Sequence, residues 1–304
     1  MNRKLGNDAQ MCGIQRVTAD GGRGDGEHLL YVHNGKLHFV LSLSHALDIP
    51  QLWHEGTNMS FVSKNGLYSR KDEFLNTFPG GMLYTCGFDA LGRIEGHPVH
   101  GRLHSIPAEL ISAEADETGV KIVAEIRQTS LIGENMVLRR TVETAYGEGA
   151  LHLTDVVTNC AFRDEKYCML YHINAGYPLC DEGAEVVADI AECTPRDAAA
   201  AKCADTVLRV EAPVDEEDEM CYRMKLRKPE ISLVNRRLGK KFTVQYNDDF
   251  LSHLVEWKDR DSQCYVMAFE PCTSWMEEEF SYKILPSGQS ITNKVTLKFE
   301  NISH

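Results

Sequence analysis

Residues 120–127 read Val-Lys-Ile-Val-Ala-Glu-Ile-Arg, and this stretch decides the fold class. Apolar side chains occupy positions 120, 122, 124 and 126, while charged side chains occupy positions 121, 125 and 127. Successive side chains of a β-strand point to opposite faces of its sheet, so this period of two predicts a strand with one face on a core and the other in water. We therefore expect a protein built from antiparallel strands.

Strand-like segments recur along the chain, and three pairs of them flank short turn-forming sequences. The pairs are 29–32 and 37–41 around Asn34-Gly35, 137–145 and 151–158 around residues 146–150, and 280–285 and 291–299 around Pro286-Ser287-Gly288. Asn-Gly suits the positive φ angles of a type I′ turn, and glycine and proline are common turn residues. Each pair predicts a hairpin, the last of which closes the C-terminal strand against the sheet.

Helical patterns are few. The alanine-rich segment 196–204 predicts a short helix that starts near Thr194, and the acidic run 215–218 predicts an exposed loop. The sequence contains no linker rich in glycine, serine or proline. We expect residues 1–304 to form a single domain, an all-β, large antiparallel sandwich with few short helices.

The composition narrows the classes of function. The 304 residues are 43% hydrophobic, and their formal net charge of −13 argues against a nucleic-acid or anionic membrane partner. The Arg139-Arg140 pair is expected on a solvated face or in a turn. The ten cysteines form no CxxC pair and are expected to be reduced thiols. Residues 1–10 are polar, and no run approaches about 18 apolar residues. We expect a cytoplasmic protein and leave open whether it forms a homodimer.

Three segments that are distant in the chain concentrate polar residues of catalytic type. They are His-Pro-Val-His-Gly-Arg-Leu-His at 97–104, Tyr-His-Ile-Asn-Ala-Gly-Tyr-Pro at 171–178 and Ala-Phe-Glu-Pro-Cys at 268–272. In an extended segment His172 and Asn174 lie on the same side, and Glu270 is expected to end a buried strand before Pro271. A carboxyl group in such a place is a candidate for a raised pKa. We expect folding to bring these segments into one site.

The order and identity of these motifs resemble the aldose 1-epimerase (galactose mutarotase) family. Within that superfamily, the chain is most similar to a mutarotase-like branch with a Gly-Gly-Leu-x-x-Thr-Cys-Gly segment. The matching elements here are Gly80-Gly81-Met82-Leu83-Tyr84-Thr85-Cys86-Gly87, His100-Gly101-Arg102 with Pro107-Ala108, His172 with Asn174 and Gly176-Tyr177-Pro178, and Glu270-Pro271. The resemblance covers most of the chain and implies the same sandwich fold.

The resemblance also implies a reaction, which is the exchange of sugar anomers by a cofactor-free isomerase. In the family, a glutamate takes the proton of the anomeric hydroxyl and a histidine protonates the ring oxygen. Glu270 is then the implied base, His172 the implied acid and His100 the supporting histidine. The chemistry agrees, because opening a hemiacetal needs one proton removed and another delivered. The implied partner is a small carbohydrate.

Further substrate contacts are expected from Arg102, Asn174, His104, His45 and Trp257. Arg102 offers a planar fork of hydrogen-bond donors, and Trp257 offers a flat apolar face to a sugar ring. His45 lies in Ser-His-Ala-Leu-Asp-Ile at 44–49, where related sequences commonly read Asp-Arg-Gly-Leu-Asp-Ile. This difference predicts an unusual sugar or a neighbouring reaction.

Two other functions remain open on the sequence. A metal-dependent sugar isomerase or lyase could use His97, His100, His104, His172 and Glu270 as ligands for zinc or manganese. Their spacing matches no strict metal motif, so we expect no metal. A non-catalytic carbohydrate-binding protein would keep the groove without turnover. Cys86 and Cys272 are expected to be small buried residues and not nucleophiles.

Overall fold

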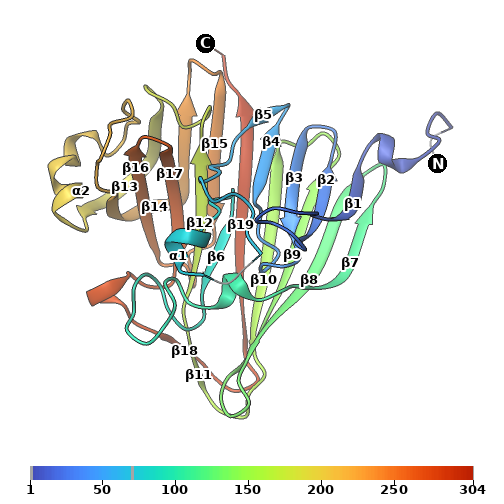
Figure 1. Ribbon diagram of the computed structural model, residues 1–304, viewed down its shortest axis with the longest axis horizontal. Coiled ribbons are helices and arrows are strands. Elements are labelled where there is room, and N and C mark those ends of the chain that lie inside the picture. The colour runs from blue at the N-terminus through green and yellow to red at the C-terminus, as the bar shows by residue number, and fades with distance from the viewer. Residues whose placement is uncertain (1–2, 70–71, 304) are drawn as a thin grey trace.

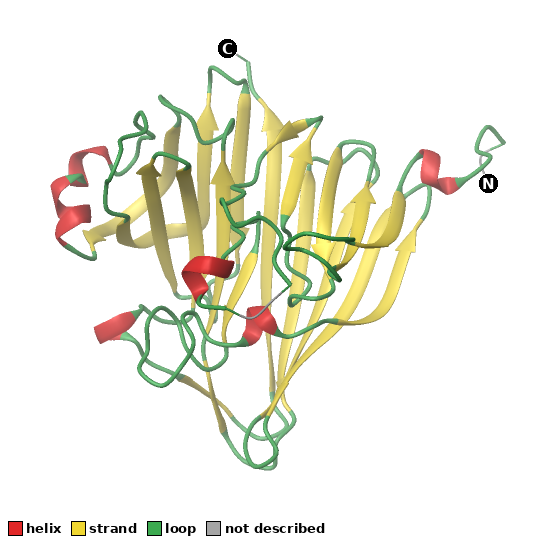
Figure 2. Ribbon diagram, in the orientation of Figure 1, coloured by secondary structure: helices red, strands yellow, loops and turns green. Residues whose placement is uncertain are grey.

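The computed structural model describes residues 3–69 and 72–303. Met1, Asn2, Arg70, Lys71 and His304, which belong to the expected domain 1–304, lie outside the described residues. Within the described residues, the strands form a sheet of 12, a sheet of 5 and a separate pair. Helices are short and few beside them (Figure 2). The predicted all-β class is confirmed.

The larger sheet is antiparallel and lies behind the other elements in Figure 1. Its strands in spatial order are β6 (Tyr84–Gly87), β12 (Met169–Gly176), β17 (Cys264–Cys272), β16 (His253–Asp261), β14 (Met220–Asn235), β15 (Lys240–Tyr246), β19 (Ser290–Asn301), β10 (Ala150–Asn159), β9 (Asn135–Ala145), β8 (Gly119–Thr129) and β7 (Glu109–Ala115). β13 (Glu185–Pro195) pairs with β14 outside this path.

The remaining strands form a smaller sheet and a separate pair. The five-stranded sheet is β1 (Gly13–Thr18), β2 (His28–His33), β3 (Leu37–Ser42), β4 (Gln51–His54) and β5 (Thr57–Asn58), and the pair is β11 (Glu165–Tyr167) with β18 (Lys283–Leu285). The α-helices are α1 (Phe74–Thr77) and α2 (Ala198–Lys202), and the 3-10 helices are η1 (Asp8–Gln10), η2 (Leu103–Ser105), η3 (Ala204–Thr206) and η4 (Glu277–Glu279). No helix in the described part of the chain has the length and apolar character needed to cross a membrane.

The main core lies between the two sheets. In Figure 1, β1 to β4 lie in front of β7 to β10. The strand predicted at 120–127 is part of β8, with one buried and one exposed face. Ile122 and Ile126 are fully buried, while Lys121 and Arg127 are exposed. A second cluster of buried apolar side chains lies on the face of β12, β16 and β17 to which Leu170, Trp257 and Ala268 point.

Two of the predicted hairpins are confirmed, β2–β3 and β9–β10. The turn of the first differs from type I′, since of the Asn34-Gly35 pair only Gly35 has a positive φ, 87°. Asn34 instead accepts hydrogen bonds from Lys36 N and Leu37 N and donates to Thr144 Oγ1. Its side chain thus closes the turn and holds a neighbouring hairpin.

The third predicted hairpin is wrong. β18 pairs with β11, while β19 lies inside the larger sheet between β15 and β10. Both edges of β19 are paired, one with β15 and the other with β10, so β18 (residues 283–285) pairs with β11 instead. The terminal strand does join the sheet, as expected.

The other local expectations hold with changes. The predicted helix begins later, at Ala198, because β13 continues to Pro195 and Asp197 then caps the helix by accepting from Ala200 N. Residues 215–218 are largely exposed. All ten cysteines, which lie among the described residues, are free thiols.

Arg140 of β9 is fully buried, which contradicts the solvated face expected for it. Its guanidinium donates to both carboxylate oxygens of Asp155 on β10, at 2.9 and 2.7 Å. It also donates to Thr85 Oγ1 on β6 at 2.9 Å and lies 3.4 Å from Asp48 Oδ1. The Tyr171 hydroxyl of β12 donates to Asp155. One buried cation therefore connects four strands, and bidentate pairing is the arrangement that best compensates it.

We predict that Asp155→Ala lowers the free energy of unfolding by about 3–5 kcal/mol, because it leaves Arg140 as an uncompensated buried charge. Urea denaturation measures the loss. Glu143→Ala is the control, since it removes a half-exposed ion pair with Lys121, and such pairs contribute little to stability. Equal losses in the two variants would contradict the importance of the Arg140 cluster.

Candidate active site

Glu270 lies inside a strand and not at its end, which corrects the expectation. β17 continues past Pro271, and its ladder with β12 pairs Phe269 and Cys272 but neither Glu270 nor Pro271. Proline has no N–H to give to such a ladder. The sequence Glu-Pro therefore makes a local gap in the backbone hydrogen-bond ladder between β17 and β12.

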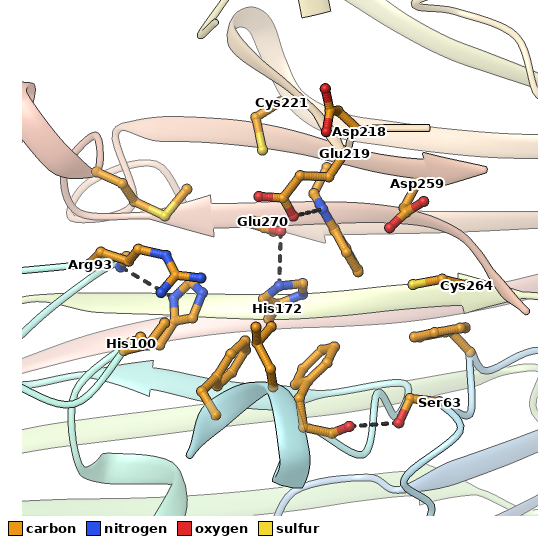
Figure 3. Close-up of a pocket in the computed structure, with 18 of the residues that line it drawn as sticks. Ser63, Arg93, His100, His172, Asp218, Glu219, Cys221, Asp259, Cys264 and Glu270 are labelled. Atoms are coloured by element: carbon orange, nitrogen blue, oxygen red, sulfur yellow. Dashed lines mark hydrogen bonds and ion pairs between the residues drawn. The ribbon is translucent and has the colours of Figure 1, made fainter. Parts of the chain in front are cut away.

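His172 of β12 faces Glu270 across this gap, since the register is the same on both sides of it. Opposite residues of antiparallel strands have Cβ atoms about 4.5–5.5 Å apart, which lets their side chains meet. His172 Nε2 lies 3.2 Å from Glu270 Oε1, and the two side chains point at one another in Figure 3. Both residues are buried, at 4% and 1% exposure.

Asn174 lies two residues beyond His172 on the same face of β12. Its Oδ1 is 2.5 Å from His172 Nδ1, and its Nδ2 donates to Gly81 O at 2.9 Å and to His172 O at 3.2 Å. Asn174 is fully buried. It was expected to contact substrate, and the structure instead places it behind the imidazole, where it orients the ring.

His100 reaches the site from the loop between β6 and η2. Its backbone N–H donates to Gly92 O, and Gly92 N–H donates to His100 Nδ1 at 3.3 Å. His100 has a φ of 62°, which is uncommon for a residue with a Cβ. Gly101 follows with a φ of 76°, and a Cβ there would lie 2.6 Å from Gly87 O. The imidazole of His100 meets that of His172 edge to face, with ring centroids 5.6 Å apart.

His100, His172 and Glu270 line a cavity of about 470 Å³. Aromatic side chains form one wall, and Trp257, as expected, is among them, with its ring centroid 5.2 Å from that of His172. Trp257 Nε1 donates to Glu219 Oε2 at 2.8 Å. The other aromatic and charged lining residues are Phe61, Phe74, Phe78, Lys64, Arg93, Arg196, Glu217, Asp218, Asp259 and Glu277.

Burial sets the protonation of the three groups. It raises the pKa of Glu270 well above its usual value, although the Arg196 charge opposes the shift. It lowers the pKa of His172 to about 4, with the hydrogen bond to Asn174 opposing. It lowers the pKa of His100 to about 3, and the charges of His172 and Arg196 act in the same direction. Both imidazoles are thus uncharged at neutral pH, and burial favours the protonated form of Glu270.

Arg196 is a functional candidate that sequence reasoning missed. It follows β13, lines the cavity, and its Nη2 lies 3.5 Å from Glu219 Oε1. Burial disfavours its charge, but Glu277 and Glu219 nearby keep the pKa of its guanidinium above the usual value. Its sequence neighbours Pro195 and Asp197 resemble a helix start and give no sign of a site.

Arg102, His104 and His45 do not line the cavity of His100, His172 and Glu270. They line a second cavity of about 790 Å³. Arg102 forms ion pairs with Asp89 and Glu134, and His104 stacks on Tyr84 with ring centroids 4.6 Å apart. His45 pairs with Glu27 at 3.1 Å. Their expected contacts with the same substrate are therefore not supported by their placement.

The placement of the histidines also disfavours the metal hypothesis. His97 lies 3.9 Å from Asp89, and His104 faces the second cavity, so neither approaches Glu270. Among residues 3–69 and 72–303, no group of three or more His, Cys, Asp or Glu side chains is placed to hold a metal ion. Cys86 and Cys272 are fully buried, and burial raises the pKa of both thiols well above the usual value, which disfavours a nucleophilic role.

Comparison with known proteins identifies relatives of this fold. The family described as "Domain of unknown function (DUF4432)" matches residues 24–283. No curated protein sequence matches the chain significantly. Among solved structures, a "putative aldose 1-epimerase" of Klebsiella pneumoniae has a TM-score of 0.85 at 22% identity, over 96% of this chain and 84% of that one.

Two further structures are similar over nearly their whole length. A galactose mutarotase-like protein of Clostridium acetobutylicum has a TM-score of 0.70 at 12% identity, covering 96% of this chain and 100% of its own. A "putative mutarotase" of Salmonella typhimurium has a TM-score of 0.68 at 11% identity, covering 95% and 94%. At these identities the likeness establishes the fold, and the expected galactose mutarotase-like sandwich is confirmed.

We predict that His100→Asn makes the free energy of unfolding less dependent on pH. Below its ordinary pKa of 6.5, His100 binds a proton in the unfolded chain but not in the folded one, where its pKa is about 3. The free energy of unfolding therefore falls as pH falls through this window, by up to about 1.4 kcal/mol per pH unit for one proton. Asparagine tolerates the positive φ and removes the imidazole. Urea denaturation at several pH values between 6 and 4 measures the slopes, and parallel slopes for wild type and variant would contradict the assignment.

Proposed function

The chain belongs to the DUF4432 family, and we propose that it interconverts the anomers of a sugar by acid–base catalysis in the cavity around Glu270. One observation carries the proposal. Glu270 is a buried carboxyl group that lies 3.2 Å from a buried imidazole. Its Oε2 has no hydrogen-bond partner within the described part of the chain. A buried polar atom without a partner is costly, and a substrate hydroxyl would satisfy it.

The reaction needs what this pair supplies. Opening the sugar ring removes the proton of the anomeric hydroxyl and delivers a proton to the ring oxygen, and reclosure reverses both transfers. Glu270 and His172 are close enough to share the two transfers between them. His100, whose Nδ1 accepts from Gly92 N–H, keeps its hydrogen on Nε2 and can donate it to a sugar oxygen.

The rest of the cavity suits a sugar. Phe61, Phe78 and Trp257 offer apolar surface for the C–H face of a ring, while Arg93 and Arg196 offer donors to hydroxyl oxygens. A mixture of apolar walls and a few polar groups is typical of small-molecule sites. The printed names of the structures with the same fold, an aldose 1-epimerase and mutarotases among them, support the same reaction class.

The proposal assigns the acid–base chemistry to side chains alone and needs no cofactor. The free thiols fit a reducing compartment, which supports a cytoplasmic location. The substrate partner is a small carbohydrate. The proposed proton transfers use no side chain of the second cavity, which contains His45 in place of the arginine of related sequences.

We predict that Glu270→Gln lowers the rate of anomer exchange by about 10²–10⁴-fold, the usual contribution of a positioned acid or base. The amide keeps the shape of the side chain but cannot exchange a proton at the required pKa. NMR saturation transfer between the anomers of a panel of aldoses measures the rate.

Glu256→Gln is the matched control. Glu256 is a fully buried glutamate on the neighbouring strand β16, and burial raises its pKa to about 8, but it lies outside the cavity lining. It should leave exchange unchanged. An unchanged rate in Glu270→Gln would overturn the proposed role of Glu270 in proton transfer, and binding of sugars without exchange by the wild type would indicate a carbohydrate-binding protein.

A further inference from the structure

We propose that the second cavity, of about 790 Å³, binds a neutral polyol such as a sugar, at a site separate from that of Glu270. Its lining includes Arg102, His104 and His45, which carry the chemistry of a binding site but lie outside the cavity of the proposed reaction. This second ligand is not part of the proposed function, whose proton transfers use other side chains.

The two cavities lie on opposite sides of shared loops. Phe78 lines the first cavity and Pro79 the second, and in the same way His100 lines the first and Gly101 the second. The ring of Tyr84 packs edge to face on Phe78, with ring centroids 5.0 Å apart, and it lines the second cavity and not the first. A ligand of the second cavity therefore contacts a different set of side chains from the sugar proposed to bind at the first.

The buried carboxylates of the second cavity are already paired. Glu27 is 2% exposed, and its Oε1 lies 3.1 Å from His45 Nε2 while its Oε2 accepts a hydrogen bond from Ser42 Oγ at 3.4 Å. Asp48 is 4% exposed, and its Oδ1 lies 3.4 Å from the Arg140 guanidinium. Buried charges are tolerated where they are compensated, and here the compensation comes from the chain itself.

The other charged groups of the lining give an ion no better partner. Arg102 forms ion pairs with Asp89 and Glu134. Asp25 and Asp72 are exposed, and water and salt screen the charges there. A charged ligand thus finds no buried, unpaired charge among the described residues that line the cavity, so the lining favours a neutral ligand.

The neutral groups, by contrast, have unused hydrogen-bonding capacity. Tyr84 is only 6% exposed, yet its hydroxyl has no hydrogen-bond partner within residues 3–69 and 72–303. Ser44 Oγ accepts from His28 N at 3.0 Å, and its own hydrogen has no acceptor in the same part of the chain. A nearly buried hydroxyl without a partner is costly, and the hydroxyl groups of a ligand can both accept from it and donate to it.

His104 extends this neutral surface. Its ring stacks on that of Tyr84, with centroids 4.6 Å apart, and its Nδ1 has no hydrogen-bond partner in the described part of the chain. Burial lowers the pKa of His104 to about 3, so the ring is uncharged at neutral pH. Apolar side chains complete the walls, and they are Pro50, Leu67, Pro79, Leu83, Pro98 and Pro107. Apolar walls with a few polar groups suit the C–H and O–H surfaces of a polyol.

The sequence difference at 44–46 points to the same class of ligand. Related sequences commonly carry aspartate and arginine at the first two of these positions, where this chain has Ser44 and His45. Both side chains line the second cavity, and His45 is paired with Glu27. The chain thus puts a hydroxyl and a paired imidazole where those sequences have a carboxylate and a guanidinium, and a neutral ligand fits this change.

Calorimetric titration of the full chain with myo-inositol and with the methyl glycosides of common aldohexoses tests the site. These probes are neutral polyols without a free anomeric hydroxyl, so they can be bound but not converted. We expect at least one probe to bind, and we expect Tyr84→Phe to weaken its binding by about 2- to 10-fold, the contribution of one hydrogen bond. Because the lost hydroxyl has no partner in the described part of the chain, this variant should not lower the free energy of unfolding without ligand.

Two control variants locate the binding. Tyr222→Phe removes the hydroxyl of another buried tyrosine, which donates to Ala200 O and lines neither cavity. Glu270→Gln changes the lining of the first cavity and not of the second. Neither control should alter the binding that Tyr84→Phe weakens.

Three results would overturn the proposal. They are no binding by any probe, binding that Glu270→Gln weakens and Tyr84→Phe does not, and tighter, Tyr84-dependent binding of the monophosphate of myo-inositol than of myo-inositol itself. The proposed function fails separately, since a chain that binds these probes but exchanges no sugar anomers would contradict the proposed reaction and leave the second site standing.

Discussion

The structure depends on the buried charge of Arg140. A guanidinium with no exposed surface is tolerated because Asp155 accepts two hydrogen bonds from it and Thr85 a third, with the Asp48 carboxylate nearby. Removal of any partner leaves a charge in a medium that solvates it poorly, so the segments that supply the partners are held in place together. They are β10, β6 and the turn before β4, which are held around β9, the strand that carries Arg140.

The same cluster positions the site through the alternation of side chains along strands. Tyr171, which donates to Asp155, points into the core between the sheets, so the next residue, His172, points to the opposite face. On that face His172 meets Glu270, because the Glu-Pro sequence opens the ladder between β12 and β17. Burial there shifts the two pKa values in opposite directions, and such pairs of groups are suited to exchange protons.

Much of the site could be predicted from residue types, but its boundaries could not. His100, His172 and Glu270 were expected together and lie together, with Trp257 beside them. Arg102, His104 and His45 carried equally suggestive chemistry, yet they pair with carboxylates or an aromatic ring around a different cavity. Arg196 was missed, since its neighbours resemble a helix cap. Hydrogen-bonding capacity is visible in a sequence, whereas the partner that uses it is chosen by contacts between distant segments.

The sequence by itself determined the strands, the faces they bury and two of the hairpins, because side-chain alternation and turn residues act over a few neighbouring positions. The tertiary structure alone decided the order of the strands. β19 lies between β15 and β10 and not in the expected hairpin with β18, since backbone ladders are chemically alike for all strands and long-range packing selects among them. For the same reason, the opposition of His172 to Glu270 and the burial of Arg140 could be read only from the folded chain.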